Sequence, residues 1–439
     1  MSSLRMIVAF AFFAVLPILV NASSDPFDVT DRYIVTLQPG VDIHEHVSHV
    51  NSLQNGTFAG ITDKYSFGNF AGYVGHFDQS VVEQLRVHEN VDVVEKDQVL
   101  YEEAAERATC SDGCSDSAKC GESDQKSQLV KRLLRRDENE LTSQNGAPWN
   151  LESISNKGKV ESIPDRETFS NLSELIKVKN RKYWYRQSAG SKTYAYVIGE
   201  GIRETHSDFG GRARLVYNPW GPGHPNDDST GLGTHYGSII GGNRYGVAKR
   251  THIFGVKVTI GGRTVASKLI VGYSWAVKDI STKKRYQRSV VHVAPYHPER
   301  VEGLQKAIRE AQRQGVVTVG PGGDRAPARY PISVGHTDRW RLPGNPGNDL
   351  NWNFGTIDLF GPGVGICSAD SKDDKAIAQR SGIAQASAHV AGLVVYLKSF
   401  NKIDTVEATK DLIMRTATQG VVKGPNGDKK PFAYNGSGK

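Results

Sequence analysis

The sequence predicts an α/β fold, a parallel sheet with helices on both faces, preceded by a small α+β domain. From Tyr194 onward, apolar strand-like runs alternate with helical runs, which is typical of a parallel sheet. Residues 31–101 contain two shorter strand–helix alternations of their own. A polar stretch, residues 102–146, separates the two parts and has no apolar period.

Length and composition limit the alternatives. The chain has 439 residues, of which 38% are hydrophobic, with 46 Gly and 18 Pro. This size is ample for two or three domains with a large core. The composition excludes a disordered acidic tail, a coiled coil and a collagen-like fibre.

The first 22 residues have the pattern of a secretory signal peptide. Arg5 precedes an apolar run from Met6 to Val20, and Asn21-Ala22 follows it. The run is short for a membrane span, and no later stretch is long enough to anchor the chain. We therefore expect a secreted, extracellular protein without a membrane anchor.

Residues 31–101 are predicted to form the small domain. Their strands alternate with period two, and their helices have the spacing of one apolar face. The predicted strands are 32–38, 72–77 and 91–94, the predicted helices are 43–53 and 79–88, and the run 97–101 closes the unit. This order is similar to a ferredoxin-like half-barrel.

Residues 102–146 are predicted to be a charged linker. They contain the dibasic pairs Lys131-Arg132 and Arg135-Arg136, so we expect cleavage by a processing protease after Arg132 and Arg136. The alternative is a solvated connector that is never cut.

Three of the four cysteines, Cys110, Cys114 and Cys120, also lie in this linker. They lack the spacing and histidines of a zinc site, so a local disulfide is favoured. Four cysteines allow three pairings, and the partner of Cys367 stays open.

Charge differs between the two parts of the chain. Residues 1–142 carry 12 Lys and Arg against 22 Asp and Glu, whereas residues 143–439 carry 42 against 25. An acidic front part and a basic body are expected to attract one another. The alternative is two unrelated solvated surfaces. The densest basic run, 283–288, is interpreted as a solvated loop, and no nucleic-acid partner is expected.

Three Asn-X-Ser/Thr sequences are candidate glycosylation sites if the chain is secreted. Their acceptor residues are Asn55, Asn171 and Asn435.

The α/β part has four predicted strands and three predicted helices. The strands are 194–198, 252–258, 289–293 and 316–319, and the helices are 265–278, 302–314 and 384–400.

Several sequence runs within this part resemble the subtilisin-like serine proteases, particularly the secreted fungal group around proteinase K. They include His206-Ser-Asp-Phe-Gly-Gly, Tyr245-Gly-Val-Ala-Lys, Asp358-Leu-Phe-Gly-Pro-Gly and Ser387-Ala-His-Val-Ala-Gly. The resemblance runs from about residue 30 to the C-terminus. It implies that the front unit is an inhibitory, chaperone-like propeptide and that residues 147–439 form a peptidase S8-type domain.

The resemblance also shows where this chain departs from the family. The family acid is replaced by Gly199, the general base by Leu232 and the nucleophile by Ala384. The oxyanion asparagine corresponds to Gly323. The substrate-pairing strand reads Ala294-Pro295-Tyr296-His297-Pro298, in which two prolines remove backbone donors.

These substitutions predict a catalytically inactive homologue that acts by binding or as a decoy. Expected partners are its own propeptide domain and a protein inhibitor or an active protease relative. The alternative is a secreted serine endopeptidase that uses non-standard residues, such as a relocated pair of Ser387 and His235. A third interpretation is a decaying gene without a selected role.

No cofactor is predicted. Calcium is common in the family that the chain resembles, but no acidic cluster transfers residue by residue. The acidic pairs at 227–228 and 373–374 are interpreted as ordinary loop carboxylates.

Overall fold

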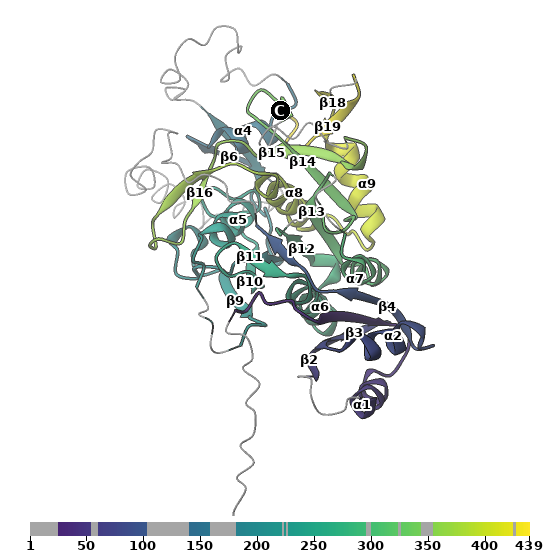
Figure 1. Ribbon diagram of the computed structural model, residues 1–439. Coiled ribbons are helices and arrows are strands. Elements are labelled where there is room, and N and C mark those ends of the chain that lie inside the picture. Colours follow the sequence, from purple (N-terminus) through teal and green to yellow (C-terminus); the bar gives the residue numbers. More distant parts are fainter. Residues whose placement is uncertain are drawn as a thin grey trace, which may run out of the picture.

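A computed structural model describes most of the chain as two packed units (Figure 1). The described residues are 25–53, 60–102, 140–158, 181–221, 224, 227–295, 300–323, 326–343, 354–424 and 427–439. The predicted signal peptide and the candidate sites Asn55, Asn171, Arg132 and Arg136 lie outside them. So do the three linker cysteines and residues 296–299.

The N-terminal unit is a four-stranded antiparallel sheet with two helices on one face. Its strand order is β2-β3-β1-β4. The elements are β1 (Arg32–Leu37), α1 (Ile43–Leu53), β2 (Gly60–Phe67), β3 (Phe70–His76), α2 (Gln79–Val87) and β4 (Val91–Lys96). The expected strands and helices are present, and β2 is an additional strand that periodicity did not predict.

Alternation along β1 divides the N-terminal unit between two cores. Tyr33, Val35 and Leu37 pack with α1 and α2, whereas Ile34 packs with side chains of the larger unit. Successive strand residues point to opposite faces, so one sheet serves both cores. The second face lies against helices of the larger unit (Figure 1).

The larger unit is built on a nine-stranded sheet of order β18-β19-β15-β14-β13-β12-β8-β10-β9. Every pairing from β9 to β15 is parallel, and β18 and β19 pair antiparallel at the other end. Its strands are β8 (Tyr194–Gly199), β9 (Ala213–Tyr217), β10 (His252–Lys257), β12 (Ser289–Val293), β13 (Val317–Pro321), β14 (Ile332–Thr337), β15 (Leu359–Pro362), β18 (Thr418–Lys423) and β19 (Lys429–Phe432).

Helices and small two-stranded sheets complete the larger unit. The helices are α4 (Trp149–Ile154), α5 (Leu232–Gly241), α6 (Ala266–Thr282), α7 (Glu302–Arg313), α8 (Ile383–Lys398) and α9 (Val406–Thr416). The small sheets pair β6 (Leu141–Asn145) with β7 (Lys182–Arg186), β16 (Ile366–Ala369) with β17 (Ile377–Arg380), and β5 (Val99–Tyr101) with β11 (Arg263–Val265).

Side chains of β8 alternate between the two faces of the large sheet. Ala195 and Val197 belong to the core formed with α5 and α8, while Tyr196 and Ile198 belong to the core formed with α6 and α7. Helices therefore cover both faces, which confirms the predicted α/β class. Among the described residues, no helix is both long and apolar enough to cross a membrane.

Candidate active site

Gly199 ends β8 at the carboxyl edge of the parallel strands, where α/β proteins usually place their sites. A Cβ atom added to Gly199 would lie 2.5 Å from Oε1 of Glu102 and 3.7 Å from Cβ of Ala294. The space that a side chain would need at position 199 is therefore taken by a side chain from the segment that follows β5.

Leu232 and Ala384 lie at the N-terminal ends of two helices that pack together. Leu232 is the first residue of α5, and Ala384 is the second residue of α8. Both are almost completely buried and belong to the same apolar core. The helices α5 and α8 contact each other, and both contact β8. The structure thus brings together the elements that carry Gly199, Leu232 and Ala384, with aliphatic groups at two positions and no side chain at the third.

The suggested pairing of Ser387 with His235 is wrong. Oγ of Ser387 lies 2.8 Å from Nε2 of His292 in β12, whereas Nε2 of His235 lies 3.1 Å from the Ile366 carbonyl oxygen. Ser387 and His235 point to different partners because α8 packs along β12 while α5 packs along β16.

The Ser387–His292 pair was not predicted from the sequence. Both residues are 0% exposed. Burial lowers the pKa of His292 to about 3, so its imidazole is neutral at ordinary pH. The signal that could have found it is the histidine among the valines of strand β12, which needs a polar partner once buried.

Gly323 is the residue that the sequence resemblance aligns with the family's oxyanion asparagine. Its φ of 99° lies in the region that favours glycine, and its N–H donates to Oγ1 of Thr356 over 3.1 Å. Glycine has no side-chain amide that could donate to an oxyanion. Of the substrate-pairing run, Ala294 is buried, and its N–H donates to the carbonyl oxygen of Ile198.

Glu200 does not replace the missing acid. Its carboxylate accepts hydrogen bonds from Oγ of Ser229 and from the N–H groups of Gly261 and Gly262, over 2.6, 2.8 and 3.0 Å. Nζ of Lys257 lies 3.9 Å from the same carboxylate. Glu200 thus holds the glycine turn that leads into β11.

Glu102 lies on the other side of that glycine turn. Its N–H donates to the Gly262 carbonyl oxygen over 2.8 Å, which continues the β5–β11 pairing by one residue. Oγ1 of Thr259 donates to Oε1 of Glu102 over 2.7 Å, and Glu102 is only 3% exposed. Burial raises the pKa of Glu102 well above its ordinary value, and Glu200 raises it further.

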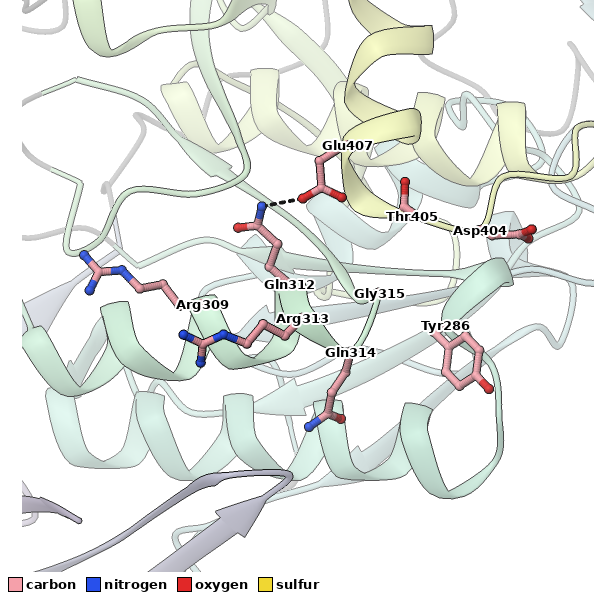
Figure 2. A pocket seen from close by; sticks show the side chains of 9 residues that line it. All are labelled: Tyr286, Arg309, Gln312, Arg313, Gln314, Gly315, Asp404, Thr405 and Glu407. Carbon is pink, nitrogen blue, oxygen red and sulfur yellow. Dashed lines mark hydrogen bonds between the residues drawn. The ribbon is translucent and has the colours of Figure 1, made fainter. Parts of the chain in front are cut away.

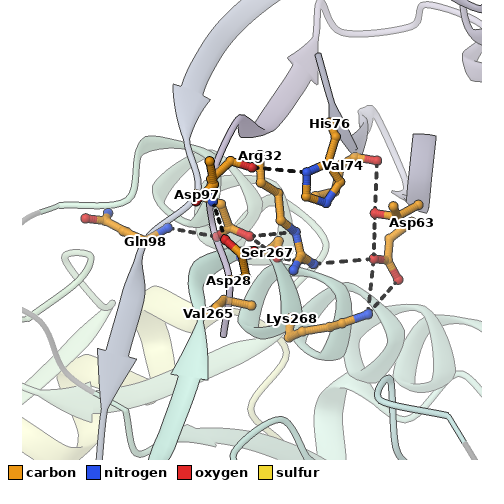
Figure 3. Close-up of polar contacts among 12 residues, drawn as sticks. Asp28, Arg32, Asp63, Val74, His76, Asp97, Gln98, Val265, Ser267 and Lys268 are labelled. Atoms are coloured by element: carbon orange, nitrogen blue, oxygen red, sulfur yellow. Dashed lines mark hydrogen bonds and ion pairs between the residues drawn. The ribbon is translucent and has the colours of Figure 1, made fainter. Parts of the chain in front are cut away.

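Two acids of the N-terminal unit occupy the N-termini of helices in the larger unit. Asp97 accepts from the N–H and hydroxyl of Ser267 in the first turn of α6, and Arg32 pairs with the same carboxylate (Figure 3). Glu95 accepts from the N–H groups of Glu302 and Gly303 in the first turn of α7. Carboxylates at these positions are stabilised by free N–H groups and the helix dipole.

Opposite charges also meet directly between the units, as the charge difference predicted. Lys268 of α6 lies 3.0 Å from a carboxylate oxygen of Asp63, the pair drawn in Figure 3. Lys306 of α7 lies 2.7 Å from a carboxylate oxygen of Asp92.

The predicted glycan at Asn435 is incompatible with the folded chain. Asn435 is 1% exposed, and its amide donates to the Trp184 carbonyl oxygen over 2.7 Å. A glycan on that nitrogen would have to displace this packing.

Cys367 is buried in β16.

A surface hollow of about 510 Å³ lies between the end of α7 and the start of α9 (Figure 2). None of the triad-equivalent residues lines it. Most of its lining side chains are polar, and two of them bond to each other, since the amide of Gln312 donates to the carboxylate of Glu407 over 2.8 Å. The described residues also include no group of three or more His, Cys, Asp or Glu side chains arranged to hold a metal ion.

The chain matches two families in sequence. Residues 190–435 match the Subtilase family, and residues 32–102 match the family described as Peptidase inhibitor I9. The chain therefore belongs to the subtilase family and carries an I9 propeptide segment ahead of the subtilase domain.

Individual relatives agree with this assignment. Alkaline protease 1 of Emericella nidulans is 30% identical over 450 residues, covering 97% of this chain and 96% of the relative. Alkaline proteinase of Hapsidospora chrysogena is 31% identical over 429 residues and covers 93% of each chain. The crystal structure of a cold-adapted subtilisin-like serine proteinase matches with a TM-score of 0.54 and 27% identity, covering 66% of this chain and 98% of that protein.

Proposed function

We propose that this subtilase is a secreted, catalytically inactive homologue that acts by binding. The observation that carries the proposal is the residue content of the triad-equivalent positions. Gly199, Leu232 and Ala384 offer no carboxylate, imidazole or hydroxyl group. Acyl transfer needs a nucleophile to form the acyl-enzyme and a base to move its proton.

Magnitudes support the proposal. In subtilisin, removing the serine or the histidine alone costs about 10⁶ in kcat. The remaining catalysis there comes from the oxyanion hole and substrate binding, and losing one oxyanion donor costs a further factor of about 10²–10³. Gly323 has no side-chain donor, so this remainder is reduced as well.

The second candidate function is a serine endopeptidase that uses Ser387. The 2.8 Å contact between Ser387 and His292 favours it, because a hydroxyl on an imidazole is the core of such a site. Complete burial of both residues argues against it, since a substrate carbonyl would have to reach Oγ.

The proposed domain roles, processing sites, glycans and partner rest on the sequence patterns. Residues 1–22 act as a signal peptide, 31–101 as the inhibitor-like domain, 102–146 as the linker and 147–439 as the subtilase domain. Processing would occur after Arg132 or Arg136 by a protease in trans, and glycans would attach at Asn55 and Asn171. The binding partner would be a protein inhibitor or an active protease relative.

Fluorophosphonate labelling tests the proposal. The secreted chain is treated before and after cleavage of its linker at Arg136, beside an active fungal alkaline protease. We expect label on the relative and none on this chain, while a cooperative melt shows that the chain is folded. Label that disappears in Ser387→Ala would contradict inactivity and establish a relocated nucleophile.

A further inference from the structure

The strand β5 and the residue after it are docked on the edge of β11, beside the position of the missing acid. The register pairs Tyr101 with Arg263, Leu100 with Thr264 and Val99 with Val265. Leu100 is 0% exposed and belongs to the core formed with α6 and α7. An added edge strand is held by main-chain hydrogen bonds and by pockets for alternate side chains.

The side chain of Glu102, the residue after β5, lies against Gly199. Its Oε1 lies 2.5 Å from where a Cβ of residue 199 would be, a separation that real Cβ atoms essentially never show. A side chain at position 199 and Glu102 in its present place therefore exclude one another. A Cβ atom at position 199 would force the far end of the Glu102 side chain to shift, whereas glycine leaves room for the carboxyl group where it lies.

The surroundings accept this carboxyl group specifically. Oγ1 of Thr259 donates to Oε1, and the Glu102 N–H is bonded to the Gly262 carbonyl oxygen. Oε2 is buried without a hydrogen-bond partner among the described residues. Burial raises the pKa of Glu102, and the nearby acids Glu200 and Asp228 raise it further.

We infer that residues 99–102 are the resident occupant of the β11 edge, anchored by Glu102 in the space left by the missing acid side chain at Gly199. The N-terminal unit is then a permanent subunit rather than a leaving inhibitor. This inference rests on the proposed function, because an active family member would need that space for its aspartate.

The test measures how fast the N-terminal unit leaves the folded protein. A recognition sequence for a site-specific protease is introduced into residues 103–139, the purified chain is cut, and the larger unit is immobilised. Release of the N-terminal fragment is followed by surface plasmon resonance. The variants are Glu102→Ala, Glu102→Gln, Gly199→Ala and the double variant Gly199→Ala/Glu102→Ala, with Tyr101→Ala as control because Tyr101 is 48% exposed.

Glu102→Ala and Gly199→Ala should each speed release about tenfold or more, since each removes or displaces a buried hydrogen-bonded group. The double variant should release no faster than Glu102→Ala, because the added methyl then meets an empty space. Glu102→Gln and Tyr101→Ala should stay close to the wild-type rate.

Two outcomes would overturn the inference: equal release from wild type and Glu102→Ala, or effects of the two single variants that add in the double variant. Labelling of the released larger unit separates this failure from failure of the proposed function. Rapid release without fluorophosphonate label refutes the anchor only, while labelled protein refutes inactivity whether or not Glu102 holds the fragment.

Discussion

At the scale of single residues, the buried acid Glu102 makes docking of the N-terminal unit depend on pH. Burial, Glu200 and Asp228 raise its pKa in the docked state, and Thr259 and Lys257 oppose this only in part. The pKa of Glu102 is higher when the N-terminal unit is docked than when it is released. Glu102 therefore stabilises docking fully at a pH below its pKa in the released unit, and this stabilisation is lost as the pH rises through its pKa in the docked state. We expect release to become faster as the pH is raised from acidic to alkaline values.

The control for this prediction is Glu102→Gln, which cannot ionise. Its release rate should depend less on pH than that of the wild type over the same range. An identical pH profile for the two proteins would show that another group is responsible.

Ser387 gives a second prediction at this scale. Ser387→Ala removes the hydroxyl that lies 2.8 Å from Nε2 of His292 but leaves the histidine its contact with the Ala384 backbone, so the free energy of unfolding should fall by about 1 kcal/mol. Chemical denaturation measures this loss, with Ser399→Ala near the end of α8 as a milder control. If Ser387 has only a structural role, Ser387→Ala does not change the fluorophosphonate labelling. Label that is present on the wild type and lost in Ser387→Ala would contradict this role.

At the scale of elements, the N-terminal unit supplies caps that two helices lack in their own N-cap residues. Those residues are Val265 for α6 and Val301 for α7, whose side chains have no hydrogen-bond acceptor. Asp97→Asn and Glu95→Gln should each weaken docking by about 1 kcal/mol, roughly fivefold in the release assay.

The matched control for the caps is Asp92→Asn. Asp92 pairs with Lys306 at a partly exposed site, and its side chain is 26% exposed. Exposed ion pairs contribute little, so this change should have a smaller effect than either cap change. An equal effect for all three variants would mean that net charge, rather than capping, holds the units together.

The element scale also shows what could be predicted from the sequence. Strands β8, β10 and β12 are predicted because buried parallel strands are continuous apolar runs. Helix α5 lacks the apolar and polar faces by which a helix is predicted from the sequence, because all ten of its residues are buried. Strand β2 was missed although its burial alternates.

The site could be predicted only in part. Family motifs point to Gly199, Leu232 and Ala384, and the structure brings their elements together. The contact of Glu102 with Gly199 could not be predicted, because it depends on how β5 docks on β11. The Ser387–His292 bond joins residues 95 positions apart, so no local sequence pattern links them.

At the scale of the whole molecule, buried neutral histidines should make the fold sensitive to acid. Burial lowers the pKa of His235 and His292 to about 3 and that of His336 and His389 to about 4. Well above pH 6.5 these histidines are neutral in both the folded and the unfolded chain. Below pH 6.5 they bind protons in the unfolded chain but not yet in the folded chain. Stability is therefore lost as pH falls from 6.5 towards 4.

Denaturant unfolding at pH 7.5 and pH 5 measures this effect. Each of the four histidines should contribute a loss of about 2 kcal/mol, about 8 kcal/mol together, and Asp228, whose raised pKa of about 6 acts in the opposite direction, offsets about 1 kcal/mol of it. Constant or increasing stability towards pH 5 would contradict the buried neutral state of these histidines.

The most direct test of the whole account is the intact mass of the full chain, made in a host that lacks other proteases and followed during incubation. We predict a chain that stays uncut within residues 103–146, because Gly199, Leu232 and Ala384, at the positions proposed for the triad, supply no carboxylate, imidazole or hydroxyl. Cleavage near Asn145 at a rate independent of protein concentration would show that the chain processes itself, and would contradict the account.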